Sequence, residues 1–369
     1  FYDVSAWTFP LAFNLNYEFL KENLSGNELF DKRSGKISGF SSYGYLIKPY
    51  DYNIPRFINY LQENGIRLKS SSKIFKIKNN YFDYGTLLIP VVGQSKKPEK
   101  IFELLTDISK KTGIDVYSLS SGYEDNIGFG SNSFTTIKKP KIGLIVGNGI
   151  RSYDAGEIWH LFDTRYGIPI TKIDVKNLNR TNLSEYSHII LPSYSGSSIN
   201  IDKIKNYLKS GGNIVAYRSS INWLQKNKIV SVDFLKHERY ASNVSFEDRR
   251  KFSGSQVIGG TIFNTKIDKS HPINFGIKNN NLPIFKNNTI FMKPDENSYN
   301  NPITYSKNPL MSGYVSDENL ELLKKSVPFK VERYYAGKIF LFSNNTNFRA
   351  FWYGTNRLLM NSIYLSNKM

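Results

Sequence analysis

The chain has 369 residues, of which 40% are hydrophobic and 22% charged, so it is a globular protein with room for two domains, or three small ones. Its net charge is +18, but the basic residues form only short clusters such as Lys138-Lys139-Pro140-Lys141, which argues against nucleic acid as a partner. Cysteine is absent, which excludes disulfides and cysteine-based zinc sites, and no apolar run approaches the ~20 residues of a membrane-spanning helix.

The first part of the chain is predicted to be a connecting segment followed by a small domain. Residues 1–35 are the connecting segment, which packs through aromatic side chains such as Trp7 and Phe19. A small α/β domain is predicted over 36–127, and its two helices are expected to stop at Gly65 and Gly113. Its expected elements are strands at 43–47, 66–68, 73–78, 82–90 and 114–117, helices at 54–61 and 101–108, and a hairpin turn at Asn79-Asn80. This order indicates one sheet with both helices on one face.

A second α/β domain is predicted over 138–369, after a Gly/Ser/Asn linker at 128–133. The apolar run at 141–146 is typical of a buried parallel strand. The following elements are predicted as helix 154–166, strands 170–173 and 188–192, helix 201–209, strand 213–217, strand 338–342 and helix 354–365. Such alternation is the pattern of a doubly wound, flavodoxin-like parallel sheet, here interrupted by a β-rich insertion at about 230–335.

None of the four histidines begins a His-x-x-Glu motif, so no zinc ligand is assigned in this chain. His160 and Asp163 lie one helical turn apart and are expected to form a surface pair. His271 precedes Pro272 and is expected to cap a turn, while His188 opens an apolar strand and is expected to serve in packing.

Three segments of the second domain match a known fold: the strand at 141–146, the turn Pro192-Ser193-Tyr194-Ser195-Gly196 and the run from Ser210 to Ala216. On these segments the domain resembles the class I glutamine-amidotransferase-like fold. Active members of that fold carry a cysteine at a strand-to-helix elbow, whereas the corresponding segment here is Tyr217-Arg218-Ser219-Ser220. Ser219 or Ser220 could replace the thiol only with a histidine base beside it, and a helix-capping role is the expected one.

The carboxyl ends of parallel strands converge at one edge of such a sheet, which is where ligands bind in this kind of fold. The residues predicted to line a candidate ligand crevice there are Asn148, Asp154, Ser193, Ser195, Ser219 and Asn344. A solvated polar rim without a ligand is the alternative and the preferred interpretation. Gly147-Asn148-Gly149 matches no phosphate-binding loop, so no nucleotide cofactor is expected.

Five segments carry a resemblance to a known family: residues 2–10 (Tyr-Asp-Val-Ser-Ala-Trp-Thr-Phe-Pro), 85–90, 130–133, 270–276 and 337–361, which occur in the expected order. On these segments the chain resembles the C-terminal part of large secreted bacterial zinc carboxypeptidases of the carboxypeptidase A type. The resemblance implies an upstream catalytic domain that carries the zinc, no cofactor in this chain, and a secreted, periplasmic or cell-surface location.

The sequence therefore predicts a non-catalytic C-terminal region that supports or positions the upstream peptidase domain, or docks a peptide, glycan or envelope protein. A stand-alone binding module of a cell-envelope complex is the alternative, and a serine hydrolase at Ser219 ranks last. The first hypothesis predicts an apolar patch near residues 1–30, the second a polar or aromatic crevice on the second domain, and the third a histidine beside Ser219 or Ser220.

Overall fold

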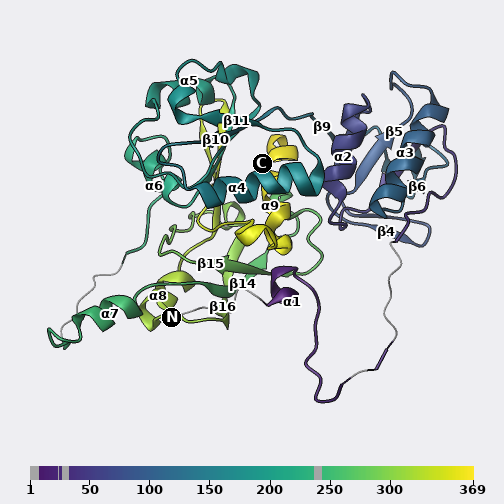
Figure 1. Cartoon of the computed structure of the whole chain (residues 1–369). Helices are drawn as coiled ribbons and strands as arrows, with labels where there is room; N and C mark the ends of the chain where they lie inside the picture. Colours follow the sequence, from purple (N-terminus) through teal and green to yellow (C-terminus); the bar gives the residue numbers. More distant parts are fainter. Residues whose placement is uncertain (1–7, 24, 27–32, 237–242) are drawn as a thin grey trace.

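The computed structural model describes residues 8–23, 25–26, 33–236 and 243–369. Within these ranges the chain forms three main sheets, shown in Figure 1: a five-stranded sheet at the right, a six-stranded sheet at the upper left, and a three-stranded sheet below it. No helix among the described residues combines the length and apolarity needed to cross a bilayer. The segment 1–7, and with it Trp7, lies outside the described residues.

The five-stranded sheet has the order β6-β1-β5-β2-β9, with every neighbouring pair antiparallel. Its strands are β1 (Gly44–Ile47), β2 (Leu68–Ser71), β5 (Leu87–Pro90), β6 (Tyr117–Ser118) and β9 (Phe134–Ile137). Helices α2 (Ile54–Glu63) and α3 (Pro98–Thr112) pack on one face, where Phe57 and Leu105 are fully buried. The opposite face packs against the hairpin of β3 (Phe75–Ile77) and β4 (Asn80–Phe82).

Three details of this sheet differ from the sequence-based prediction. The hairpin turn is Lys78-Asn79 rather than Asn79-Asn80, because Ile77 pairs directly with Asn80 and Lys78 takes the positive φ of 51° that the tight turn needs. The single strand expected at 82–90 is not continuous: β4 ends at Phe82, a turn follows, and β5 begins at Leu87. Strand β9 was not predicted, and it pairs with β2. The proposed domain boundaries stay predictions.

The six-stranded sheet has the order β11-β10-β12-β13-β18-β17 and is parallel except for the edge pair β17–β18. Its strands are β10 (Ile142–Val146), β11 (Thr171–Asp174), β12 (His188–Leu191), β13 (Asn213–Tyr217), β17 (Phe329–Tyr334) and β18 (Gly337–Phe342). Counted within the five parallel strands, the order is 2-1-3-4-5, which is the flavodoxin-like order. The prediction of a parallel α/β sheet is confirmed.

Helices lie on both faces of this sheet. On one face, side chains such as Leu144 and Phe340 pack with α9 (Tyr353–Tyr364) and with α4 (Ser152–His160), which continues into the π-helical turn η2 (Leu161–Tyr166). On the other face, side chains such as Ile189 and Leu341 pack with α5 (Ile201–Lys209) and α6 (Ser219–Lys226). The doubly wound pattern is only partly met, since the connection from β11 to β12 holds two short 3₁₀ turns, η3 (Val175–Asn177) and η4 (Leu183–Glu185).

The insertion between α6 and β18 contains more than the expected β segments. Its antiparallel sheet has the order β15-β14-β16, built from β14 (Thr261–Ile267), β15 (Asn281–Lys286) and β16 (Ile303–Ser312). It also holds two helices that were not predicted, α7 (Arg249–Ser255) and α8 (Asp317–Lys324). Helix α1 (Phe9–Ala12) packs beside this sheet (Figure 1). Its Leu11 belongs to the same buried cluster as Trp352, which is fully buried.

Hydrogen bonds tie the five-stranded and six-stranded sheets together. Arg56 of α2 donates to the Arg165 carbonyl in η2 at 2.6 Å. At the end of the chain, the Asn367 amide donates to the Thr136 carbonyl at 3.2 Å, and the Lys368 ammonium donates to the Ser70 carbonyl at 2.9 Å. The joint between the sheets therefore includes polar contacts from two separate segments, beside a buried apolar cluster that both parts share.

Candidate functional site

The chain turns sharply at Arg218, between the end of β13 and the start of α6. Arg218 has φ 54° and ψ −120°, a backbone conformation that costs a residue with a side chain about 1–3 kcal/mol. Its N–H donates to the Phe342 carbonyl at 2.8 Å, and its carbonyl accepts from the Ile221 N–H at 3.0 Å. Nucleophile elbows present their reactive side chain from such a strained position between strand and helix. In this chain the position carries a guanidinium, which is not a nucleophile.

The side chain of Arg218 forms a buried ion pair with Asp154 of α4. The guanidinium Nη1 lies 3.3 Å and 3.5 Å from the two carboxylate oxygens, and the side chains are only 8% and 6% exposed. Burial raises the pKa of Asp154, while the nearby charges of Arg218 and Arg151 and the N–H of Ser193 act to lower it. Because either charge alone would be costly to bury, the two side chains hold each other ionised.

Glu157, one helical turn after Asp154, also lies at this edge of the sheet. Its carboxylate accepts hydrogen bonds from the side-chain amide of Asn345 and from the Arg349 N–H, both beyond the end of β18. Burial raises the pKa of Glu157 to about 7, although these two hydrogen bonds oppose the shift. Glu157 therefore ties α4 to the loop after β18, and its carboxyl group titrates near neutral pH.

The insertion contributes a buried lysine to the same edge. The ammonium of Lys286, at the end of β15, donates to the Ile290 carbonyl at 2.9 Å and to the side chains of Asn288 and Asn344, each at 3.1 Å. The Asn344 amide in turn donates to the Tyr305 hydroxyl at 3.2 Å. Burial lowers the pKa of Lys286 well below its usual range, and the charge of Arg218 adds to this effect.

The six predicted crevice residues differ in exposure and in their contacts. Asn148 and Ser195 are exposed, Ser193 and Ser219 are half-buried, and Asp154 and Asn344 are buried. The structure brings Ser193 and Ser219 together, with their hydroxyl oxygens 2.7 Å apart, and the backbone of Ser193 acts to lower the pKa of Asp154. Asn344 belongs instead to the group around Lys286. That these six residues bind a ligand remains a prediction.

The two loops at the expected crevice bond to each other. The Arg151 N–H donates to the Ser193 carbonyl, and the Ser195 N–H donates to the Gly149 carbonyl, both at 2.9 Å. Gly149 has φ 80°, and a Cβ atom on it would lie 2.7 Å from the ring of Tyr194, so this close approach requires glycine. The switch point between β10 and β12 is thus occupied by the protein's own loops.

The contacts of Ser219 and Ser220 bear on both the expected helix cap and the hydrolase hypothesis. Arg218, not Ser219 or Ser220, is the N-cap of α6, and it makes no side-chain capping bond, so the predicted serine cap is wrong. The Ser220 hydroxyl donates to the Pro192 carbonyl and the Ser219 hydroxyl pairs with Ser193, so neither bonds to an imidazole among the described residues. His237 lies outside the described residues.

His271 and His188 have structural roles. His271 is the N-cap of a 3₁₀ turn, where its Nδ1 accepts from the Ile273 N–H at 3.2 Å, as predicted. His188 is buried at the start of β12, and burial lowers its pKa to about 3. Across residues 8–23, 25–26, 33–236 and 243–369, no three acidic or histidine side chains gather closely enough to hold a metal ion.

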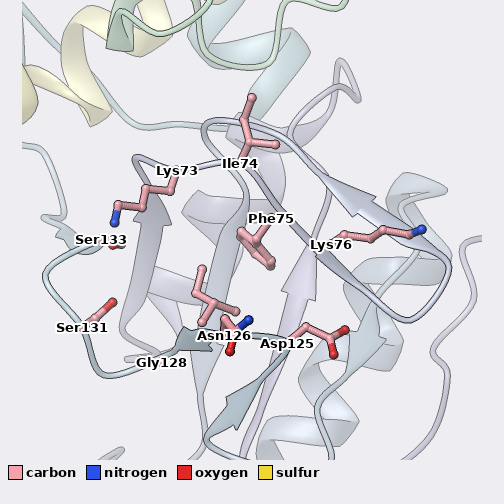
Figure 2. A pocket seen from close by; sticks show the side chains of 10 residues that line it. Lys73, Ile74, Phe75, Lys76, Asp125, Asn126, Gly128, Ser131 and Ser133 are labelled. Atoms are coloured by element: carbon pink, nitrogen blue, oxygen red, sulfur yellow. The ribbon is translucent and has the colours of Figure 1, made fainter.

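A pocket of about 550 Å³ lies on the five-stranded sheet's hairpin side and was not predicted. Figure 2 shows Phe75 at its centre, with Lys73 and Ser133 to one side and Lys76 and Asp125 to the other. The Phe75 ring stacks on Phe82 at a centroid distance of 5.1 Å, which holds the aromatic floor in place. An aromatic floor with charged and hydroxyl groups around it suits a small polar ligand such as a sugar or peptide end.

Comparison with known proteins finds distant structural likeness only. No family model and no curated protein matches the sequence. Among solved structures, the chain is similar to a ThuA-like protein from Parabacteroides merdae (14% identity, 60% of this chain and 88% of that one, TM-score 0.39). It is also similar to PurLQS from Thermotoga maritima (13% identity, 63% of this chain and 100% of that one, TM-score 0.41). Likeness at this level does not extend to function.

Proposed function

We propose that this chain is a non-catalytic unit of a secreted zinc carboxypeptidase-like protein, and that it supports or positions the catalytic domain that binds the zinc. The observation that carries the proposal is the buried pair of Arg218 and Asp154. A strained elbow, which is the position from which related geometries present a nucleophile, is committed here to an ion pair. Peptide hydrolysis near a free carboxylate would then belong to the zinc-binding domain.

The finer fold assignment is part of the same proposal: the six-stranded part is a degenerate class I glutamine-amidotransferase-like domain. The 2-1-3-4-5 order of its parallel strands and the positive φ of Arg218 support this assignment. A domain of this kind that lost its cysteine would keep a rigid scaffold while losing its thiol chemistry.

Exposed apolar side chains in the N-terminal part of the described chain support the proposed role. Phe9, Leu15, Tyr17, Phe19 and Leu20, here called the apolar strip, are between 47% and 89% exposed. Figure 1 shows the chain leaving α1 as an extended segment away from the sheets. Since exposed apolar side chains in one short segment mark interaction surfaces, the strip is the surface proposed to cover the catalytic domain.

The alternative, a stand-alone binding module of a cell-envelope complex, is favoured by one observation, the aromatic-floored pocket of Figure 2. That pocket lies in the five-stranded part, not on the parallel sheet where the sequence predicted the crevice. It suits a peptide or glycan and needs no catalytic partner. A serine hydrolase at Ser219 has the least support, because its hydroxyl bonds to Ser193.

Hydrogen exchange tests the supporting role. The isolated chain of residues 1–369 is compared with the native polypeptide that contains it, purified from its source. The account expects the amides of residues 9–20 to exchange at least tenfold more slowly in the native polypeptide, because the apolar strip is covered there. The segment around Phe246, whose side chain is as exposed as that of Phe19, serves as the control and should not change. Equal exchange of residues 9–20 in both samples contradicts the proposal.

A further inference from the structure

A cavity of about 600 Å³ lies at the edge of the parallel sheet where the strands begin, opposite the elbow edge. It is called here the amino-edge cavity. Its lining comes from the segment 138–141 ahead of β10, from the first residues of β12 and β13, from β18, and from the end of α9. A volume of this size is within the range of small-molecule sites.

Two buried polar atoms of the lining residues have no hydrogen-bond partner among the described residues. They are Nε2 of His188 and the hydroxyl of Tyr364, whose side chains are 4% and 5% exposed. Both atoms have almost no accessible surface, and both side chains form part of the cavity wall. The other ring nitrogen of His188 is engaged, since Nδ1 lies 3.0 Å from the Ser187 hydroxyl.

The charge of the lining is positive. Four lysines line the cavity, together with one carboxylate, that of Glu185. Glu185 pairs with Lys141 at 2.7 Å, and Lys139 pairs with Glu63 at 3.0 Å. Within the part of the chain that the structure describes, the remaining two lysines, Lys138 and Lys338, have no carboxylate partner.

Lys338 is the better placed of these two cations. Its ammonium donates to the Ser366 carbonyl at 2.7 Å, which leaves two of its three donors for another acceptor. Burial and the nearby charge of Arg333 lower the pKa of Lys338, so an anion beside it would relieve an unfavourable environment. The ring of Tyr207 and the side chain of Ile363 line the same cavity and offer apolar surface to the hydrocarbon part of an organic ligand.

We propose that the amino-edge cavity binds a small organic oxyanion, a phosphate monoester or a carboxylate, with the anionic group at Lys138 and Lys338 and the organic group near His188 and Tyr364. The lining includes residues 366 and 367, and Asn367 bonds to the Thr136 carbonyl of the five-stranded sheet. Ligand binding would therefore also stabilise the joint between the two sheets. This inference does not depend on the proposed function.

Imidazole NMR tests the proposal directly, because the chain has only four histidines. The His188 signals are assigned by elimination from His160→Gln, His237→Gln and His271→Gln variants. The chain is titrated with phenyl phosphate, with benzoate and with uncharged phenol at constant ionic strength. The expected result is a saturable shift of the His188 signal with phenyl phosphate or benzoate and none with phenol. Which anion saturates at the lower concentration separates the phosphate source from the carboxylate source.

Lysine variants separate a built site from the general attraction of a basic protein for anions. The Lys138→Met/Lys338→Met double variant should weaken binding at least about tenfold, and Lys138→Met alone, on an exposed side chain, by a smaller factor. The control double variant Lys176→Met/Lys251→Met removes the same charge from side chains that are 77% and 80% exposed and should leave the affinity within about twofold. Absence of a saturable His188 shift, or equal weakening by both double variants, overturns the proposal.

Discussion

The guanidinium of Arg218 lies 3.3 Å from the carboxylate of Asp154, 64 positions earlier in the chain, and both side chains are buried. This contact joins the turn after β13 to helix α4 at the edge of the sheet where the sequence predicted a ligand crevice. It explains how a non-glycine residue is held at a strained elbow, since the ion pair and two backbone hydrogen bonds all act on the same residue.

Breaking the pair from one side is expected to destabilise the fold strongly. Arg218→Met leaves the Asp154 carboxylate buried beside Arg151 alone, whose Nε is 3.7 Å away, and should cost about 3 kcal/mol. The Arg218→Met/Asp154→Leu double variant removes both charges and should recover most of that loss. Urea unfolding of Arg218→Met, Asp154→Leu, the double variant and the wild type measures the coupling. Additive losses in the double variant would show that the two charges do not depend on each other.

The backbone strain at Arg218 is separable from its charge. Arg218→Ala and Arg218→Gly both remove the guanidinium, but only glycine adopts φ 54° and ψ −120° without steric cost. Arg218→Gly should therefore be more stable than Arg218→Ala by about 1 kcal/mol. Ser219→Gly and Ser219→Ala, at the next position, give the matched comparison inside a helix, where the order should be reversed. Equal stabilities of the two Arg218 variants would mean that the elbow relaxes.

The sequence predicted the parallel sheet well and its polar edge poorly, for physical reasons. Apolar runs such as 141–146 and 213–217 are short and contain β-branched residues, which favours buried strands over helices. Arg218 could have been noticed, because it follows β13 directly and precedes a short helix. The buried position of Lys286 could not have been predicted, since nothing in the run Leu282-Pro283-Ile284-Phe285-Lys286 shows that the strand ends inside the molecule. Contacts between the insertion and the sheet depend on tertiary structure.

Glu157 is expected to make stability depend on pH near neutrality. Its pKa is about 7 in the folded chain against an ordinary value of 4.5, so the folded state binds this proton more tightly than the unfolded state. Stability is therefore lost as the pH rises from about 4.5 to 7, by up to about 3 kcal/mol, and is constant above that range. The difference in unfolding free energy between wild type and Glu157→Gln, measured from pH 4.5 to 8, should show this slope.

Taking the difference removes the histidine contributions, which have the opposite sign. Burial lowers the pKa of His188 to about 3 and that of His271 to about 4, so these groups destabilise the fold as the pH falls below about 6.5 in both proteins. A difference that does not vary with pH would show that Glu157 has an ordinary pKa and is accessible to water.

The apolar strip is expected to contribute to stability only when the catalytic domain that covers it is present. Phe19→Ser should leave the unfolding free energy of the isolated chain within about 0.5 kcal/mol, since the ring is 89% exposed. In the native polypeptide the same change should destabilise the contact and lower the unfolding temperature. Phe246→Ser, at a ring of equal exposure elsewhere, should have no effect in either protein. If Phe19→Ser and Phe246→Ser change the unfolding temperature of the native polypeptide equally, the apolar strip is not the surface that contacts the catalytic domain.

The decisive measurement is the zinc content and peptidase activity of the native polypeptide that contains this chain. About one zinc ion per molecule and release of C-terminal residues from peptides are expected, both lost on treatment with a chelator. Ser219→Ala is expected to leave this activity unchanged, because Ser219 only pairs with Ser193. A native protein that contains no zinc and hydrolyses no peptide would contradict the account and leave the binding module as the better explanation.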